Sequence, residues 1–312
     1  KTAQVLHWPL AFAQVFAQGG FDCVLGNPPW EVSQMGEEEF FATRAPEIAA
    51  LQGDTRKRAI QQLATENPAL WEAFAIESQR IGAVNNFYRD SGRFELTAVG
   101  KLNTYPLFAE TMMHLTAPQG RAGFIVPTGI ATDDSTKAFF GHISQSGRLV
   151  SLYDLENREK LFPAVDSRMK FCLLTLGAAP AAEFVCFAVQ VAELTDPRRR
   201  FSLTPDEFCL INPNTLTCPV FRSERDAELT KKLYRAAPVL IREAVVEGSR
   251  TVSPEVNPWG ITFSQGLFNM TSASHLFESA PAPDRLPLYE AKLIHQFDHR
   301  WATYTPAGDS RD

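Results

Sequence analysis

The sequence predicts an α/β fold in which a mostly parallel, doubly wound sheet is closed by an antiparallel hairpin. Short apolar runs of strand length alternate with longer segments whose apolar residues recur at helical spacing. Glycine and proline stand at most of the boundaries between these segments, as is typical of turns. In open sheets of this kind, ligands bind beyond the carboxyl ends of the strands, so we expect chemistry in the residues that follow each strand.

The first predicted strand covers residues 21–25. A short helix over residues 10–18 precedes it and stops at Gly19-Gly20, and the strand itself stops at Gly26 and two prolines. The later elements are predicted in this order: a polar helical region over 31–100 with an interruption at Asn67-Pro68, an amphipathic helix over 101–117, a strand over 122–126, a helix over 139–146 and a strand over 149–154.

The predicted sheet ends in an antiparallel hairpin formed by residues 171–176 and 184–191, which are joined by a turn of small residues around Pro180. After about residue 195 the pattern becomes irregular and rich in proline and asparagine. We therefore expect a sheet domain over residues 1–195 and a C-terminal extension over residues 196–312.

Composition narrows the classes of protein to consider. The net charge of −6 argues against a surface that grips nucleic acid everywhere, because neutralising phosphates requires clustered lysine and arginine. No apolar run approaches the roughly 18 residues of a membrane span, and no signal-peptide pattern opens the chain, so a cytoplasmic location is expected. The five cysteines include no C-x-x-C pair, which favours reduced core residues over a zinc or redox centre.

The residues that follow the first strand, Asn27-Pro28-Pro29-Trp30, suggest a specific chemistry. Each proline fixes its own φ, lacks an N–H and restricts the preceding residue, so the turn is stiff and rich in hydrogen-bond acceptors. The Asn27 side-chain oxygen and the Pro28 carbonyl suit an exocyclic amine, because two accepted hydrogen bonds localise the lone pair that the ring otherwise delocalises. Preorganised dipoles of this kind support catalysis.

Trp30 adds an aromatic face to this turn. A base inside a duplex reaches such a site only when it is flipped out, and stacking on an aromatic side chain returns roughly 1–3 kcal/mol of the cost. The competing interpretation is a plain proline turn with Trp30 in the core. An N-P-P-aromatic string directly after an apolar strand is rare by chance, which favours the functional interpretation.

Residues 21–30 resemble the catalytic motif of the gamma class of amino-group DNA methyltransferases, in particular the long methylases of type IIG restriction-modification and of BREX- or DISARM-like phage defence. The resemblance covers roughly residues 5 to 180. It implies an adenine-specific enzyme that moves a methyl group from S-adenosylmethionine to the exocyclic amine of a flipped adenine in double-stranded DNA. Asn27 and Pro28 would polarise the amine, Pro29 would stiffen the turn and Trp30 would hold the base.

The resemblance also implies roles for two phenylalanines. Residues 102–108 and 120–127 are similar to the family's next helix and strand, where an aromatic at Phe108, together with Asn27, lies by the cofactor. Lys160-Leu161-Phe162-Pro163 resembles the motif whose phenylalanine stacks on the flipped base, so Phe162 is expected to face Trp30. A phenylalanine in such a string is otherwise a common core residue.

In this family, S-adenosylmethionine is bound by a glycine-rich turn after the first strand and an acidic residue after the second strand, and both precede the catalytic motif. The sequence has neither, because Gly19-Gly20 and Gly26 are the only glycines before Asn27. We expect an incomplete Rossmann-like methyltransferase sheet without its first strands, so that the catalytic domain over 1–195 lacks its cofactor-binding half and is inactive alone. The missing upstream part, double-stranded DNA and restriction or defence-system subunits are the expected partners, and residues 196–312 are expected to lead to target recognition.

Two basic runs are candidates for contact with DNA phosphates: Arg56, Lys57 and Arg58, and Arg198, Arg199 and Arg200. The competing interpretation of both is a solvated surface. No metal site is predicted.

Two alternatives remain for the function. N-P-P-aromatic turns also occur in methyltransferases that act on protein glutamine or on RNA, although the long insert and tail favour DNA. A non-catalytic scaffold or recognition subunit would keep the fold without the cofactor half.

Overall fold

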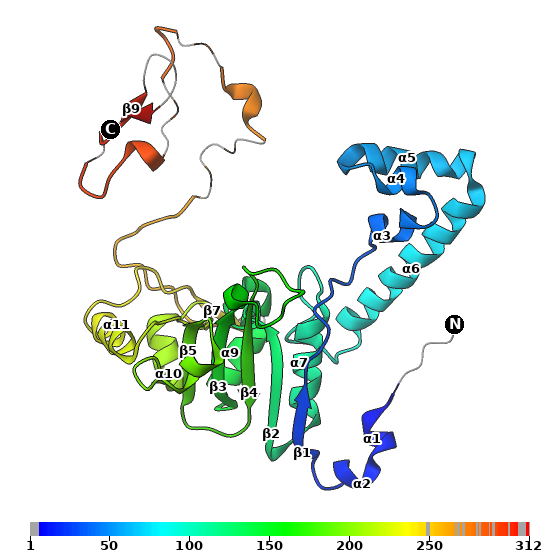
Figure 1. Cartoon of the computed structure of the whole chain (residues 1–312). Helices are drawn as coiled ribbons and strands as arrows, with labels where there is room; N and C mark the ends of the chain where they lie inside the picture. Colours follow the sequence, from blue (N-terminus) through cyan, green and yellow to red (C-terminus); the bar gives the residue numbers. More distant parts are fainter. Residues whose placement is uncertain are drawn as a thin grey trace. The chain divides into compact units, whose positions relative to one another are not determined.

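The computed structural model describes residues 6–247, 250–264, 266, 269, 272–278, 280, 282–286, 288, 291–298, 300–304 and 310–311. The chain forms two compact units, Lys1–Trp259 and Gly260–Asp312. In the first unit, helices flank a six-stranded sheet (Figure 1).

The sheet of the first unit is mixed and has the strand order β1-β2-β4-β3-β5-β6 (Figure 1). In that order the strands are β1 (Phe21–Gly26), β2 (Thr116–Pro127), β4 (Lys170–Leu176), β3 (Leu149–Glu156), β5 (Ala182–Ala188) and β6 (Phe201–Leu203). Strands β1, β2, β3 and β5 are parallel to one another, and β4 and β6 run in the opposite direction. The predicted α/β class is confirmed, and β1, which leads to Asn27, forms one edge of the sheet.

The predicted hairpin of residues 171–176 with 184–191 is wrong, because β4 and β5 are not neighbours in the sheet, and the antiparallel hairpin at this place has a different partner. Strand β4 forms the hairpin with β3, and β5 lies on the other side of β3 and pairs with it in parallel. The link from β4 to β5 passes the start of β3, where Gly177 N donates to Arg148 O at 2.8 Å and Ala179 N donates to Gly147 O at 2.9 Å. Neighbouring strands are only about 4.8 Å apart, so a short link can cross one strand and join the next. The pattern of apolar residues does not distinguish such a link from a hairpin turn.

Strand β2 begins earlier than predicted. Thr116 already pairs with Phe21, and a bulge separates this pair from the pair of Arg121 with Cys23. A Cβ at Gly120 would lie 2.7 Å from the carbonyl oxygen of Phe21, so this close approach of the two strands requires glycine.

Side chains alternate between the two faces of the sheet, because successive strand residues point to opposite sides. On one face, Phe124, Leu152, Leu174 and Phe184 form a core with three helices, α7 (Thr104–Leu115), α9 (Lys137–Gln145) and α10 (Pro205–Ile211). Full burial of a side chain of this size contributes about 1.5–3 kcal/mol, so this core fixes the sheet.

The other face carries a smaller cluster of buried side chains: Leu155, Phe171, Val185, Ala188 and Leu194. Partly buried Trp30 and Phe162 both pack against it. Phe162 is thus positioned by the face of the sheet opposite the helical core, whereas Trp30 also packs against that core.

A helical insert separates β1 from α7, as the pattern over 31–100 predicts. It consists of α3 (Glu37–Ala42), α4 (Pro46–Ala49), α5 (Gly53–Glu66) and α6 (Pro68–Asp90). The interruption at Asn67-Pro68 is a helix start, where the Asn67 side chain accepts a hydrogen bond from Leu70 N at 3.2 Å. The insert has its own small core of Phe41, Ala45, Ile48, Ile60 and Leu63.

Residues after 195 extend the sheet domain. Phe201 of β6, Phe208 of α10 and Ala227 of α11 (Glu224–Ala236) are buried in the helical core. The packing unit therefore ends at Trp259, well after the change in sequence pattern. The functional boundary expected near residue 195 stays a prediction.

The remaining elements of the first unit are short: α1 (Trp8–Ala11), α2 (Ala13–Phe16), α8 (Gly129–Thr132), η1 (Asp134–Thr136), η2 (Asn157–Glu159), η3 (Val191–Thr195), β7 (Val245–Glu247) and β8 (Arg250–Ser253). The second unit contains η4 (Ser274–Leu276), η5 (Ala291–Leu293), β9 (Thr303–Tyr304) and β10 (Ser310–Arg311). Among the residues that the structure describes, no helix is both long and apolar enough to cross a bilayer.

Candidate functional site

The carboxyl ends of β1, β2 and β3 lie together along the same end of the sheet, its carboxyl edge, because the three strands are parallel. Asn27, Thr128 and Asn157 are the first residues after Gly26, Pro127 and Glu156, the ends of these strands. The structure therefore brings the turn at Asn27 and the loop that contains Phe162 to the same edge.

A buried carboxylate ties the strand ends together. Asp154, which is 3% exposed, accepts a hydrogen bond from Thr128 Oγ1 at 2.6 Å and another from Phe187 N at 3.1 Å. Phe187 has a φ of 60°, which is unusual for a residue with a side chain, and the bond from its N–H helps to hold this backbone. Asp154 thus joins the ends of β2, β3 and β5.

The proline turn presents its acceptors without internal partners. Asn27 is exposed, whereas the neighbouring Pro28 is buried. Within the described part of the chain, neither the Asn27 side chain nor the Pro28 carbonyl takes part in a hydrogen bond. The exposed Asn27 side chain is therefore open to a ligand, and the Pro28 carbonyl is not used by a hydrogen bond within the described chain.

The start of α7 holds the exit of this turn. Thr104 Oγ1 donates to the Pro29 carbonyl at 2.7 Å and accepts from Glu31 N at 3.0 Å, and Thr104 N donates to the Glu31 carbonyl at 2.9 Å. One residue earlier, Asn103 pairs with Val32 in an antiparallel bridge. A single threonine therefore fixes the backbone on both sides of Trp30.

Trp30 is half-buried, and its indole N–H donates to the Ile125 carbonyl of β2 at 3.3 Å. The ring packs against the helical core as well as the smaller cluster on the other face. The indole orientation is thus set by both packing and a polar contact, as buried tryptophan usually requires.

Phe162 lies in a loop that one buried amide organises. The Asn157 side chain is fully buried and donates to three carbonyls, those of Phe162, Val165 and Asp166, at 3.0, 3.0 and 3.2 Å. Its oxygen accepts from Phe162 N at 2.9 Å. The Phe162 ring meets the Phe171 ring edge-on at 5.0 Å between centroids.

Phe108 is 43% exposed on α7. It follows Thr104 by four residues, which places both on the same side of the helix. An exposed phenyl ring on the side that holds the proline turn fits the stacking role expected against the adenine of a cofactor.

The basic run in the insert is partly occupied by internal ion pairs. Arg56 bonds to Glu38 at 3.1 Å and to the Ala49 carbonyl at 2.7 Å. Lys57 lies 3.6 Å from Asp54, and only Arg58 is exposed without an ion pair among the described residues. Arg58 is therefore the member of this run best placed to meet a phosphate.

The second basic run is paired throughout: Arg198 with Asp196 at 2.9 Å, Arg199 with Glu193 at 2.8 Å and Arg200 with Glu183 at 3.1 Å. Arg200 also donates to the Leu194 carbonyl at 3.0 Å. The three carboxylates offset positive charge that would otherwise attract phosphates. To contact DNA as expected, these arginines would have to exchange their carboxylate partners for phosphates.

The cysteines divide into two groups. Cys172, Cys186 and Cys218 are buried, as the sequence predicts, and burial raises the pKa of each thiol, that of Cys186 to about 12. Cys23 and Cys209 are exposed, so the prediction that all five are core residues is wrong for these two. Within the described residues, no group of three His, Cys, Asp or Glu side chains is arranged to hold a metal ion.

The sequence does not identify Thr104, Asp154 or Asn157 as residues that position the site. Each acts through hydrogen bonds to residues that are distant in the chain or to backbone groups of a loop. Thr104 and Asp154 carry no local pattern that would reveal these bonds. Asn157 directly follows a strand, which is a weak indication of a turn-forming role.

No family model and no curated protein matches the sequence. Solved structures similar to part of the chain include the methyltransferase subunit of a type I restriction-modification system from Streptococcus thermophilus, with a TM-score of 0.36 and 13% identity over 64% of this chain and 37% of that one. The modification subunit of a putative type I restriction enzyme from Vibrio vulnificus YJ016 has a TM-score of 0.35 and 12% identity over 61% and 35%. The type IIG restriction endonuclease BpuSI has a TM-score of 0.30 and 16% identity over 41% and 17%.

The chain thus spans well under half of the length of each of these proteins. Similarity at this level of identity and TM-score assigns neither a family nor a function.

Proposed function

We propose that this chain carries the target-base part of an adenine-specific DNA methyltransferase of a restriction-modification or phage-defence system. The observation that carries the proposal is the turn at Asn27-Pro28-Pro29. It follows a strand at the carboxyl edge of the sheet, and its two acceptors have no partner in the described chain. Ligand sites in open α/β sheets occupy this edge.

The chain's own residues would act on the amine of a flipped adenine. Asn27 Oδ1 and the Pro28 carbonyl would accept its two N–H groups, which raises the electron density on the nitrogen that attacks. Thr104 keeps the turn in place through the Pro29 carbonyl. Trp30 and Phe162 pack against one cluster and would hold the base by stacking.

S-adenosylmethionine, when bound, supplies the electrophilic methyl group. Phe108 and Asn27 are the residues of this chain that would contact it, and both are exposed. The sequence before Asn27 offers no glycine-rich turn for the cofactor. We therefore propose that tight cofactor binding depends on a protein segment that precedes β1.

The test is methylation by the protein that contains this chain together with the preceding segment. Amplified bacterial DNA, which carries no modified bases, is incubated with radiolabelled S-adenosylmethionine, and N6-methyladenine is measured by mass spectrometry of the nucleosides. Asn27→Ala should abolish methylation and leave binding to duplex DNA nearly unchanged. Asn86→Ala, which alters an exposed asparagine of α6, is the matched control.

Substantial activity in the Asn27→Ala protein would refute the assigned role. Parallel reactions with RNA and with a glutamine-containing peptide separate the alternative methyltransferases, because label in either substrate but not in DNA would reject the DNA assignment. The scaffold alternative predicts that the same protein fails to bind S-adenosylmethionine at all.

A further inference from the structure

Helix α6 has a middle section that the other described residues of the first unit leave exposed. The helix has 23 residues, and none of them is buried. Near its start, Trp71 and Phe74 pack on the core of the insert, and near its end Tyr88 meets the Phe94 ring at 5.5 Å. Between these ends, Ile76 is 59% exposed. Helices in proteins are stabilised mainly by burial of an apolar side. The exposed apolar residues in the middle of α6 are therefore suited to binding another protein segment.

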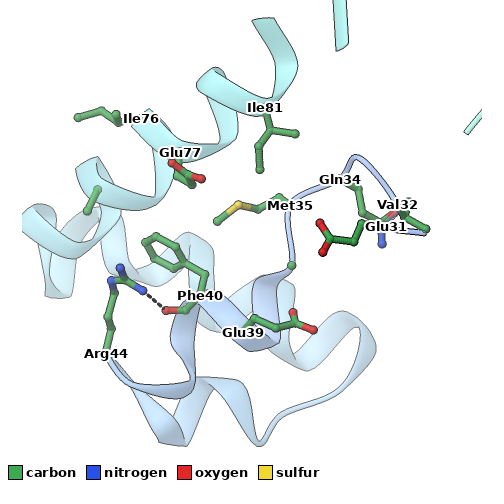
Figure 2. Close-up of a pocket in the computed structure, with 12 residues that line it drawn as sticks. Glu31, Val32, Gln34, Met35, Glu39, Phe40, Arg44, Ile76, Glu77 and Ile81 are labelled. Carbon is green, nitrogen blue, oxygen red and sulfur yellow. Dashed lines mark hydrogen bonds between the residues drawn. The ribbon is translucent and has the colours of Figure 1, made fainter. Parts of the chain in front are cut away.

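A cleft of about 910 Å³ lies along this section, between α6, α3 and residues 31–36 (Figure 2). Its apolar lining consists of Val32, Met35, Phe40, Ala73, Ile76 and Ile81. Figure 2 shows Met35 reaching between α6 and the residues of α3. The volume is far larger than one side chain and falls in the upper part of the range of ligand sites.

The lining of the cleft carries three glutamates, Glu31, Glu39 and Glu77, and one arginine, Arg44, so its net charge is negative. Glu77 binds Arg80 through two contacts of 2.6 and 2.9 Å. Arg44 donates to the Phe40 carbonyl at 2.7 Å and lies 4.3 Å from the centre of the Phe40 ring.

Glu31 and Glu39, in contrast, are exposed, and their carboxylates have no ion pair or hydrogen bond among the residues that the structure describes. Figure 2 places these two glutamates on the same side of the cleft. The cleft is therefore apolar along α6 and acidic at the segment that follows Trp30.

We infer that this cleft is a docking site for a segment of a partner protein that carries basic side chains next to apolar ones. Apolar side chains of the partner would cover Ile76 and Met35, and a lysine or arginine would meet Glu31 and Glu39. Amphipathic segments bind apolar grooves in this manner, and complementary charge sets their orientation. DNA is disfavoured as the occupant, because the net negative charge of the lining would repel its phosphates. The inference does not depend on methyl transfer.

The site shares its backbone with the proline turn. Glu31 directly follows Trp30, and Ser33 is held to α6 by hydrogen bonds with Asn85 of 2.6 and 2.9 Å. A partner bound here would contact the segment that leaves the turn.

The test uses the whole chain and a fluorescein-labelled helical peptide of leucine and lysine of about 14 residues, long enough to cover the groove. Fluorescence anisotropy should show saturable binding. Glu31→Gln combined with Glu39→Gln should weaken binding about tenfold, because two partly shielded ion pairs are lost. Ile76→Ser should weaken it by about the same factor, and its exposure means that folding should persist, which circular dichroism checks.

The matched control is Glu47→Gln combined with Glu66→Gln, which changes the net charge equally at two exposed residues outside the cleft. This control should bind the peptide like the unmodified chain. Equal loss in the control and the cleft variant would show binding to overall charge and overturn the proposal. Absence of saturable binding, or tighter binding of a glutamate-for-lysine peptide or of duplex DNA, would overturn it as well.

Discussion

Asn157 and Phe162 are joined by two reciprocal hydrogen bonds: the Asn157 amide donates to the Phe162 carbonyl at 3.0 Å, and its oxygen accepts from Phe162 N at 2.9 Å. The side chain is fully buried and also donates to Val165 and Asp166. The backbone position of Phe162 is thus fixed by a fully buried polar side chain.

Asn157→Ala should lower the free energy of unfolding by about 2–3 kcal/mol, because it leaves several backbone groups without partners in a buried place. Urea denaturation measures this, with Asn86→Ala expected to change little. Trypsin should also cleave the native variant faster at Arg158, Lys160 or Arg168, which lie in the loosened loop. Unchanged cleavage would mean that Asn157 does not hold the loop.

Thr104→Val should uncouple the proline turn from α7 without changing the volume of the side chain. The variant loses the hydrogen bonds to the Pro29 carbonyl and from Glu31 N. We expect a loss of about 1–2 kcal/mol in the free energy of unfolding. In a methylation assay kcat should fall while the Kd for DNA stays the same. Thr104→Ser should restore both the free energy of unfolding and kcat. If the serine variant behaves like the valine variant, the hydroxyl is not what matters.

The stability of the link between α6 and α7 should depend on pH through Glu110. Burial by itself would raise the pKa of this carboxyl, but the His114 side chain 3.8 Å away and the hydrogen bonds from Thr97 Oγ1 and Leu96 N outweigh burial and lower the pKa. A group with a lowered folded-state pKa stabilises the fold above its unfolded pKa, and this stabilisation is lost as pH falls through the folded value.

The free energy of unfolding should therefore decline less steeply between about pH 5 and pH 3 in Glu110→Gln than in the unmodified chain. Glu72→Gln, at an exposed position of α6, is the control. If the free energy of unfolding declines equally steeply in Glu110→Gln and in the unmodified chain, another carboxyl dominates the acid transition.

Thiol labelling should distinguish the two groups of cysteines. Exposed Cys23 and Cys209 should react with Ellman's reagent in the native protein, and Cys209 should be the slower of the two, because partial burial raises the pKa of its thiol, which also donates to Gln145 Oε1 at 3.3 Å. Buried Cys172, Cys186 and Cys218 should react only on unfolding, because burial both blocks access and raises the pKa of their thiols. Cys23→Ser should remove the faster of the two exposed thiols. Rapid reaction of more than two native thiols would contradict the packing of β4 and β5.

The sequence alone determined the class of the fold and the place of the proline turn. Alternating apolar residues define β2 to β5, because a half-buried or fully buried strand requires them. Two consecutive prolines follow β1, and they end the strand because neither has an N–H to donate to a neighbouring strand. The helical insert and its interruption at Asn67 follow from equally local rules.

Only the tertiary structure decided the order of the strands and the surroundings of the turn. Pattern shows that β4 and β5 are strands but not that β3 lies between them, since a short link that skips a strand looks like a hairpin turn. Likewise, Thr104 and Asn157 are ordinary polar residues until folding places a carbonyl or an amide within hydrogen-bond distance. Burial periodicity is a local property of the chain, whereas hydrogen-bond partners and strand neighbours depend on which distant segments meet.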